Sequence, residues 1–358
     1  MGSTTLTFRP RHRPWALPSP PPAADADGVI RITAASPAAS ALLIFQAVLP
    51  FLLFAPAPAD GGPVRLEIRG GTNVSFSPSY EYLDQVLLPA LHAAFGLRVD
   101  RALVRRGWST GPPAPAGCIS LAVHQLPPGT PLRPLPAAPA DLAVTAVVAT
   151  VAAPAPLHAP LARALARDVA VLFPDADLEL APAEDSGHDA RVYVLLVARA
   201  AGRRWAADCL FAEKRRGRDW AALADGLSRR VGRALHAEVA RGGAGDGYLQ
   251  DQMVVFQALA EGRTVFARPE EGEEGVEALV EGVQDLLVGD GEGLRQDRTR
   301  EPFGEGSPHT TTARWVTAEL LPQVKWFDRG RVCEGVGMAA PEPAVKEAGA
   351  EEASTSAS

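Results

Sequence analysis

The stretch VRLEIRGGTNVSFSPSYEYLDQVLLPALHAAFG, residues 64–96, decides how this chain folds, because a strand, a turn and a helix follow one another in it. Apolar and polar residues alternate from Val64 to Ile68, which predicts a half-buried strand. The glycine pair Gly70 and Gly71 can adopt backbone conformations closed to other residues and predicts a turn. Apolar residues then recur at helical spacing until Gly96, a helix stop signal. The succession is typical of a protein whose helices cover a sheet.

Strands and helices continue to alternate beyond this stretch. Residues 97–108 and 118–126 are strand candidates joined by a proline- and glycine-rich connection. Past a proline- and alanine-rich boundary at 130–140, residues 141–240 show a sheet-and-helix pattern of their own and could form a compact inserted domain. Two further helices are expected, one from about residue 247 and one over residues 312–323. The pattern predicts the α/β or α+β class.

The longest apolar run covers residues 41–59 and is broken by Gln46 and Pro50. Its uninterrupted pieces are far below the ~20 residues that a membrane-spanning helix needs. We therefore expect a buried helix followed by a buried strand through about residue 55, and no membrane partner.

Composition narrows the class of protein further. Apolar residues make up 47% of the 358 residues, which is enough for two domains or for one large domain with an insertion. A net charge of -7 argues against a broad electrostatic nucleic-acid surface and leaves room only for a local basic groove. The three cysteines lie far apart without a CxxC pair, so neither a zinc site nor a disulfide framework is implied. A reducing compartment follows by default.

Among seven histidines, His309 stands out because it lies between Pro308 and three threonines, just before an apolar-periodic run. Proline and threonine there mark a helix start, where threonine can cap free backbone N–H groups. The positive end of the helix dipole favours a neutral imidazole, which is nucleophilic and could attack phosphorus. A surface histidine near a helix end is the alternative, and the local pattern alone favours it.

The segment YLQDQ, residues 248–252, places Tyr248, Asp251 and Gln252 on one side of a helix, because they are three or four residues apart. A ring, a carboxylate and an amide together could hold a base, a ribose or a metal-bound phosphate. A solvated helical face is the alternative and is favoured when the segment is taken alone.

Three weaker signals concern phosphate and RNA. Backbone N–H groups in the RGGTNV turn could cradle a phosphate, although no GK[ST] of a P-loop follows. Two basic clusters could contact an RNA backbone, although a solvated face is the favoured interpretation of each cluster taken alone. Their members are Arg101, Arg105 and Arg106, and Lys214, Arg215, Arg216 and Arg218.

Taken together, these motifs resemble those of the RNA 3'-terminal phosphate cyclase family. IRGGTNVSFSPSYEYLDQVLLP looks like the central family motif, YLQDQMVVFQALAEG is similar to its C-terminal helix motif, and HTTTARWVTAELL resembles its histidine motif. GSTTLTF near the start and CEGVGM near the end are further points of resemblance. The similarity extends, with gaps, from residue 2 to about residue 340.

The resemblance implies a fold, an activity and a site. It implies repeated sheet-and-helix units formed by residues 1–140 and 241–340, an inserted α/β domain at 141–240 and a disordered tail at 341–358. It implies a ligase that takes ATP and a divalent metal, usually Mg2+, forms a histidine–AMP intermediate at His309, and converts an RNA 3'-phosphate to a 2',3'-cyclic phosphate. The positions that match the family's nucleotide contacts are Gln46, Pro78, Tyr248, Asp251 and Gln252. RNA 3' ends, not DNA, are the expected partner, and the nucleus (nucleoplasm), or otherwise the cytoplasm, is the expected location.

The chain also departs from the family pattern. It starts downstream of a first unit with a glutamate and triple-glycine motif, which predicts a core lacking that unit. RRGWSTGPPAPAG stands where the family has a lysine and a glycine triplet, and an acidic insertion occupies residues 269–293. A catalytically inactive RNA-binding or ribosome-assembly relative and a truncated, non-functional product are therefore alternatives to the enzyme. RNA substrate and oligomeric state stay open.

Overall fold

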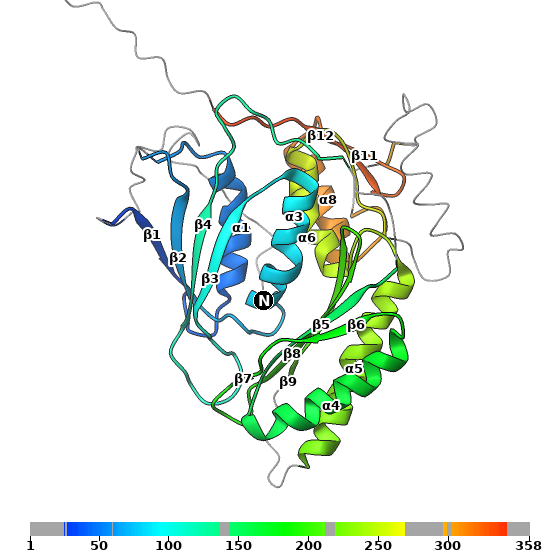
Figure 1. Cartoon of the computed structure of the whole chain (residues 1–358). Coiled ribbons are helices and arrows are strands. Elements are labelled where there is room, and N and C mark those ends of the chain that lie inside the picture. The colour runs from blue at the N-terminus through cyan, green and yellow to red at the C-terminus, as the bar shows by residue number, and fades with distance from the viewer. Residues whose placement is uncertain are drawn as a thin grey trace, which may run out of the picture.

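The computed structural model describes residues 25, 27–58, 60–136, 143–211, 219–268, 296–298 and 302–341. Four predicted features lie outside these residues: the strand near the start, the basic cluster at 214–218, the acidic insertion at 269–293 and nearly all of the tail. The described part of the chain contains three sheets with helices packed on them (Figure 1), so the predicted α/β class is confirmed.

The first unit is built around residues 64–96 and is a four-stranded sheet with helices on one face (Figure 1). Its strand order is β1-β2-β4-β3, with β1 parallel to β2 and the other pairs antiparallel. The helix after the glycine turn has a π-helical turn in its middle and ends at Gly96 in the left-handed conformation, as predicted. The elements are β1 (Val29–Thr33), α1 (Ala41–Leu53), β2 (Val64–Gly70), α2 (Tyr80–Tyr82), the π-turn η2 (Leu83–Leu87), α3 (Leu88–Phe95), β3 (Val99–Arg105) and β4 (Gly117–Val123).

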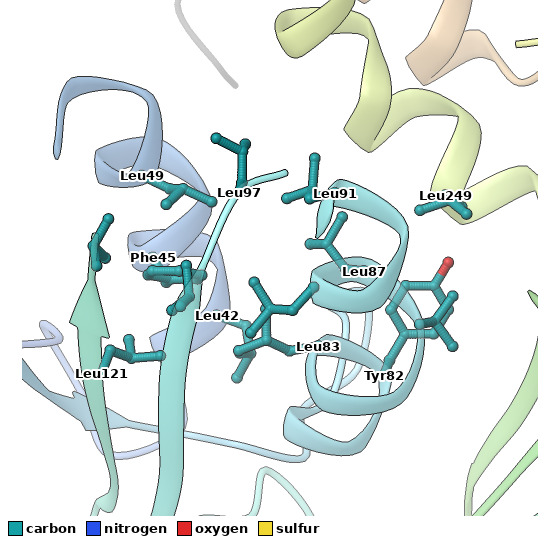
Figure 2. Packing of buried hydrophobic residues seen from close by; sticks show 14 of the residues in the cluster. Leu42, Phe45, Leu49, Tyr82, Leu83, Leu87, Leu91, Leu97, Leu121 and Leu249 are labelled. Carbon is teal, nitrogen blue, oxygen red and sulfur yellow. The ribbon is translucent and has the colours of Figure 1, made fainter. Parts of the chain in front are cut away.

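The expected strand after residue 50 does not form, because α1 continues as one helix through Pro50 to Leu53. Phe45, Leu49 and Leu53 are four residues apart, so continuing the helix keeps all three on the buried face. Figure 2 shows Phe45 and Leu49 pointing at the leucines of the neighbouring helix. Burial of this apolar row outweighs the one helical hydrogen bond that Pro50 cannot donate.

Residues 146–241 form a second unit with a sheet of its own. The sheet has the order β6-β5-β8-β9, with the short β7 pairing beside β5. Helices α4 and α5 cover one face, and the opposite face joins the core of the first unit. That this segment is an independent domain stays a prediction. The elements are β5 (Ala146–Ala153), α4 (Ala155–Leu172), β6 (Asp177–Leu180), β7 (Glu184–Asp185), β8 (Val192–Ala200), β9 (Arg203–Phe211) and α5 (Trp220–Arg241).

The third unit returns the chain to the first unit's core. Its antiparallel strands have the order β10-β12-β11, and helices α6 and α8 pack side by side (Figure 1). Leu249 of α6 reaches the leucine cluster of the first unit (Figure 2). The elements are α6 (Gly247–Leu259), β10 (Glu261–Val265), α8 (Pro308–Leu320), β11 (Lys325–Phe327) and β12 (Val332–Val336). Across the described ranges, no helix combines the length and the apolar character that crossing a membrane requires.

Candidate active site

Helix α6 begins where three parts of the molecule meet, and the buried carboxylate of Asp246 holds them together. One oxygen accepts the backbone N–H groups of Tyr248 and Leu249 at 3.0 Å each, which caps the helix, and the Tyr82 hydroxyl at 2.7 Å. The other oxygen accepts the N–H of Ala206 in β9 at 2.9 Å. Burial raises the pKa of Asp246 to about 6, although the Tyr82, Leu249 and Ala206 hydrogen bonds lower it. Asp246 thus fixes the start of α6 against both other units.

Tyr248 follows immediately and presents its ring to solvent. Its exposed fraction is 64%, while its inner edge contacts Tyr82 at a centroid distance of 6.3 Å and an interplanar angle of 84°. Burial of part of the ring raises the pKa of the Tyr248 hydroxyl, and the nearby carboxylates of Asp208 and Asp246 raise it further. A ring fixed at one edge with an open face can stack on a planar base.

Gln252 connects α6 to α1. The Gln46 side-chain amide donates a hydrogen bond to the Gln252 amide oxygen, and the Gln252 nitrogen approaches Asp251 at 3.4 Å. Gln46 and Gln252 are far apart in sequence, so only the packing of α1 against α6 brings their side chains together. Two predicted site positions are therefore in direct contact.

His309 lies in the first turn of α8. The Ser307 hydroxyl caps this helix by accepting the Thr310 N–H at 3.1 Å, and Pro308 occupies the first turn. The imidazole is exposed and makes no hydrogen bond to any residue in the described part of the chain. Burial raises the pKa of Asp251, while the Gln252 hydrogen bond and the nearby imidazole of His309 lower it, so His309 lies near Asp251. The ring is therefore exposed and lies near the polar side of α6.

A buried ionic cluster beneath the start of α8 was not predicted. Glu305 accepts hydrogen bonds from Arg329 at 2.6 Å and Arg331 at 2.8 Å, and Arg314 donates to the Glu305 carbonyl. The Arg314 guanidinium also lies over the Trp326 ring at 5.7 Å, and burial lowers its pKa to about 10. This cluster anchors the inner side of α8, which leaves the outer side, with His309, facing outward.

Pro78 joins the site through its neighbours. It is half-buried, and the Ser77 hydroxyl hydrogen-bonds that of Ser40, the N-cap of α1, at 2.5 Å. On its other side, the Ser79 hydroxyl accepts the N–H of Tyr82 at 3.0 Å. The structure thus connects Gln46, Gln252, Asp251 and His309 on one side, and on the other it connects Pro78 to Tyr82 and Tyr248 through Ser79.

The glycine turn does not cradle a phosphate, which corrects the expectation from its sequence. The N–H of Gly71 donates to the Ala39 carbonyl, and those of Thr72 and Asn73 donate to the Gly107 carbonyl, so these donors are occupied. Gly70 and Gly71 are required for close packing, and positive φ angles are not the reason. A Cβ on Gly71 would lie 2.3 Å from the Val74 side chain.

The described basic cluster is also occupied by protein partners. Arg101 donates to Asp84, and Arg105 donates to the Ala116 carbonyl. Arg106 pairs with Glu81 at 2.6 Å and Glu184 at 2.7 Å while only 9% exposed. These contacts give the three arginines structural partners, and the buried Arg106 fits neither the expected solvated face nor an RNA-binding surface.

Sequence reasoning missed Tyr82, Asp246 and Asp208. An aspartate directly before a helical motif is a capping signal that could have identified Asp246. Neither Tyr82 nor Asp208 carries such a local signal, because each acts through residues distant in sequence. For metals, no group of three His, Cys, Asp or Glu side chains gathers within the part of the chain that the structure describes.

These features define a class: an α/β protein of linked sheet-and-helix units that brings together an exposed histidine, an open aromatic ring and polar side chains from separate units. Residues 1–324 match the RNA 3'-terminal phosphate cyclase family, and the chain belongs to that family.

Individual relatives cover only part of the sequence. An RNA 3'-terminal phosphate cyclase of Drosophila melanogaster is 49% identical over 71 residues, 20% of this chain and 18% of that protein. One of Nitrosospira multiformis is 31% identical over 232 residues, 64% of this chain and 60% of that protein. A probable RNA 3'-terminal phosphate cyclase of Dictyostelium discoideum is 26% identical over 240 residues, 66% of this chain and 52% of that protein. The chain thus spans less than two thirds of the length of these relatives.

Proposed function

We propose that this protein converts an RNA 3'-terminal phosphate to a 2',3'-cyclic phosphate, with ATP as the second substrate and His309 as the nucleophile. The observation that carries the proposal is the position of His309 near the polar side of α6, with an imidazole that is exposed and that no described residue hydrogen-bonds. Family membership supports the reaction type, and the relatives named above carry the same activity in their names.

In the first step, an imidazole nitrogen of His309 attacks the α-phosphorus of ATP. A P–N bond forms, the bond to the bridging oxygen breaks, and pyrophosphate leaves. Positioning and charge neutralisation dominate such a step. The anchored start of α8 supplies the positioning, because the ionic cluster around Glu305 fixes the helix that carries the histidine.

Nucleotide binding in this proposal uses the residues on α6 and α1. The open face of Tyr248 stacks on the base, while the amides of Gln46 and Gln252 offer hydrogen-bond donors and acceptors. Mg2+ commonly uses one or two carboxylates together with substrate phosphates, which fits Asp251 as a single protein ligand. When bound, the metal would offset phosphate charge.

In the second stage, an oxygen of the RNA 3'-phosphate attacks the phosphorus of the histidine–AMP adduct and the P–N bond breaks. The adjacent 2'-hydroxyl then attacks the RNA phosphorus and loses its proton. The bond to AMP breaks, which closes the cyclic phosphodiester and releases AMP.

The test is adenylylation of the folded, full-length chain. Incubation with ATP labelled at the α-phosphate is expected to give an acid-labile labelled protein, and His309→Ala is expected to abolish the label. His124→Ala is the matched control, because His124 is a partly exposed histidine at the end of β4 that hydrogen-bonds Asp100. Absence of label on a folded wild-type chain, or label that survives His309→Ala, would refute the proposed mechanism.

A second candidate is a catalytically inactive relative that binds RNA or assists ribosome assembly. RRGWSTGPPAPAG, in place of the family's lysine and glycine triplet, favours it, and the two arginines in this segment are held by protein partners. Co-sedimentation with pre-ribosomal particles, without adenylylation, is its expected signature. Location in the nucleus belongs to both proposals and rests on family resemblance.

A further inference from the structure

The second unit turns an apolar sheet face toward the first unit, and one carboxylate interrupts it. Side chains alternate between the two faces of a strand, so Ala206, Asp208 and Leu210 of β9 share a face. Ala206 belongs to the core of the first unit, and Leu210 packs against that core. Asp208 between them is exposed to solvent. A charge between two packed residues that still reaches solvent marks a solvent-accessible point where the second unit meets the first.

No cation neutralises this carboxylate within the described residues. Among the described residues, the side-chain donor to Asp208 is the hydroxyl of Tyr193, at 3.0 Å, which also hydrogen-bonds Ser79 at 2.6 Å. The surrounding protein raises the pKa of Asp208, and the nearby charge of Glu81 raises it further. The described residues therefore use only part of the acceptor capacity of Asp208, because an ionised carboxylate has about four lone-pair sites.

Two independent routes place Asp208 beside Tyr248. Along β9, the N–H of Ala206 donates to Asp246, which caps the helix of Tyr248, and Asp208 lies about 7 Å further along the same face. Through side chains, Tyr193 joins Asp208 to Ser79, and Ser79 caps the short helix of Tyr82, whose ring contacts Tyr248. The electrostatic effect of Asp208 on the Tyr248 hydroxyl agrees with this placement.

We propose that Asp208 is a specificity-determining residue that accepts a hydrogen bond from the nucleoside of the ATP bound against Tyr248. The donor is either the exocyclic amine of adenine or a ribose hydroxyl, since a carboxylate accepts hydrogen bonds and donates none. Its negative charge also directs the phosphates away from β9 and toward His309. The second unit thereby takes part in nucleotide selection. This inference rests on the proposed function, because it requires the nucleotide to bind at Tyr248.

Equilibrium binding to the full-length chain tests the inference, measured by calorimetry with ATP, 2'-deoxy-ATP, 3'-deoxy-ATP and inosine triphosphate. Asp208→Ala is expected to weaken ATP binding about ten-fold or more, the size of a lost hydrogen bond to a charged acceptor. Asp208→Asn, which keeps one acceptor oxygen, is expected to lose less. Tyr193 retains Ser79 as a partner in both variants, so folding should be preserved, and thermal unfolding checks this.

The nucleotide analogues identify the donor. If Asp208 binds the adenine amine, the wild-type protein should bind inosine triphosphate as weakly as Asp208→Ala binds ATP. If Asp208 binds a ribose hydroxyl, the wild-type protein should bind one of the two deoxynucleotides that weakly. Asp177→Ala is the matched control, because Asp177 is exposed on β6, at the opposite edge of the same sheet. Unchanged or tighter ATP binding by Asp208→Ala would overturn the inference while leaving the proposed function intact. A wild-type chain that binds no ATP would instead reject the proposed function.

Discussion

Asp246→Asn is the most informative perturbation of the fold, because the wild-type carboxylate is fully buried and its pKa is raised from 3.8 to about 6. The folded protein holds the proton more tightly than the unfolded chain does. The stability from this group is therefore fully present below pH 3.8 and is lost as the pH rises through about 6. The size of the loss is about 3 kcal/mol in the free energy of unfolding.

Asparagine keeps the cap but cannot titrate. Its oxygen can still accept the N–H groups of Tyr248 and Leu249, whereas its NH2 group faces the N–H of Ala206 and leaves that donor without an acceptor. That loss costs about 1–3 kcal/mol and does not depend on pH. The variant is therefore expected to be less stable than wild type at pH 4. This difference in the free energy of unfolding between wild type and variant, the stability gap, should narrow or reverse by pH 7.

Urea unfolding followed by tryptophan fluorescence at several pH values between 4 and 7 measures this gap. Taking the difference between variant and wild type removes the titration of the other carboxylates, which both proteins share. Asp219→Asn at the exposed start of α5 is the matched control for loss of a capping charge. A gap that is constant with pH, or that widens as the pH rises, would refute the assignment of a raised pKa to Asp246.

The remaining predictions concern packing and charge. Arg106→Ala leaves Glu81 buried without its cation and is expected to lower the free energy of unfolding by about 3–5 kcal/mol. Arg167→Ala, which breaks an exposed ion pair, should cost about 1 kcal/mol or less. Equal effects of the two variants in urea unfolding would contradict this prediction. Gly335→Ala places a Cβ 2.3 Å from a backbone carbonyl oxygen and should lower the free energy of unfolding by about 1–3 kcal/mol. Gly226→Ala, within α5 and in open space, should raise it by about 0.5–1 kcal/mol. Thermal unfolding of both variants tests the opposite signs. The three cysteines are buried, and burial raises the pKa of each thiol. The native protein should therefore react with a thiol reagent far more slowly than the unfolded protein. Comparable rates of the two at pH 8 would show that the thiols are accessible.

Much of the local structure was predictable because it depends on neighbours in sequence. The helix from Tyr80 to Phe95 ends at Gly96 because only a residue without a Cβ adopts the left-handed conformation easily. The helix starts near Asp246 and Ser307 follow capping chemistry that is encoded within a few residues. The prediction failed after Pro50, where burial of Leu53 in the core of the first unit outweighed a local breaker signal.

The sequence by itself determined the α/β class, the placement of Tyr248, Asp251 and Gln252 on one helical side, and the position of His309 at a helix start. Only the tertiary structure decided that Gln46 contacts Gln252, that Asp246 links three units, and that the Tyr193 hydroxyl of β8 donates to Asp208 of β9 while also hydrogen-bonding Ser79 of the first unit. The physical reason is the range of the interactions. Helix periodicity and capping act over about four residues, whereas these contacts join segments brought together by burial of a shared apolar core.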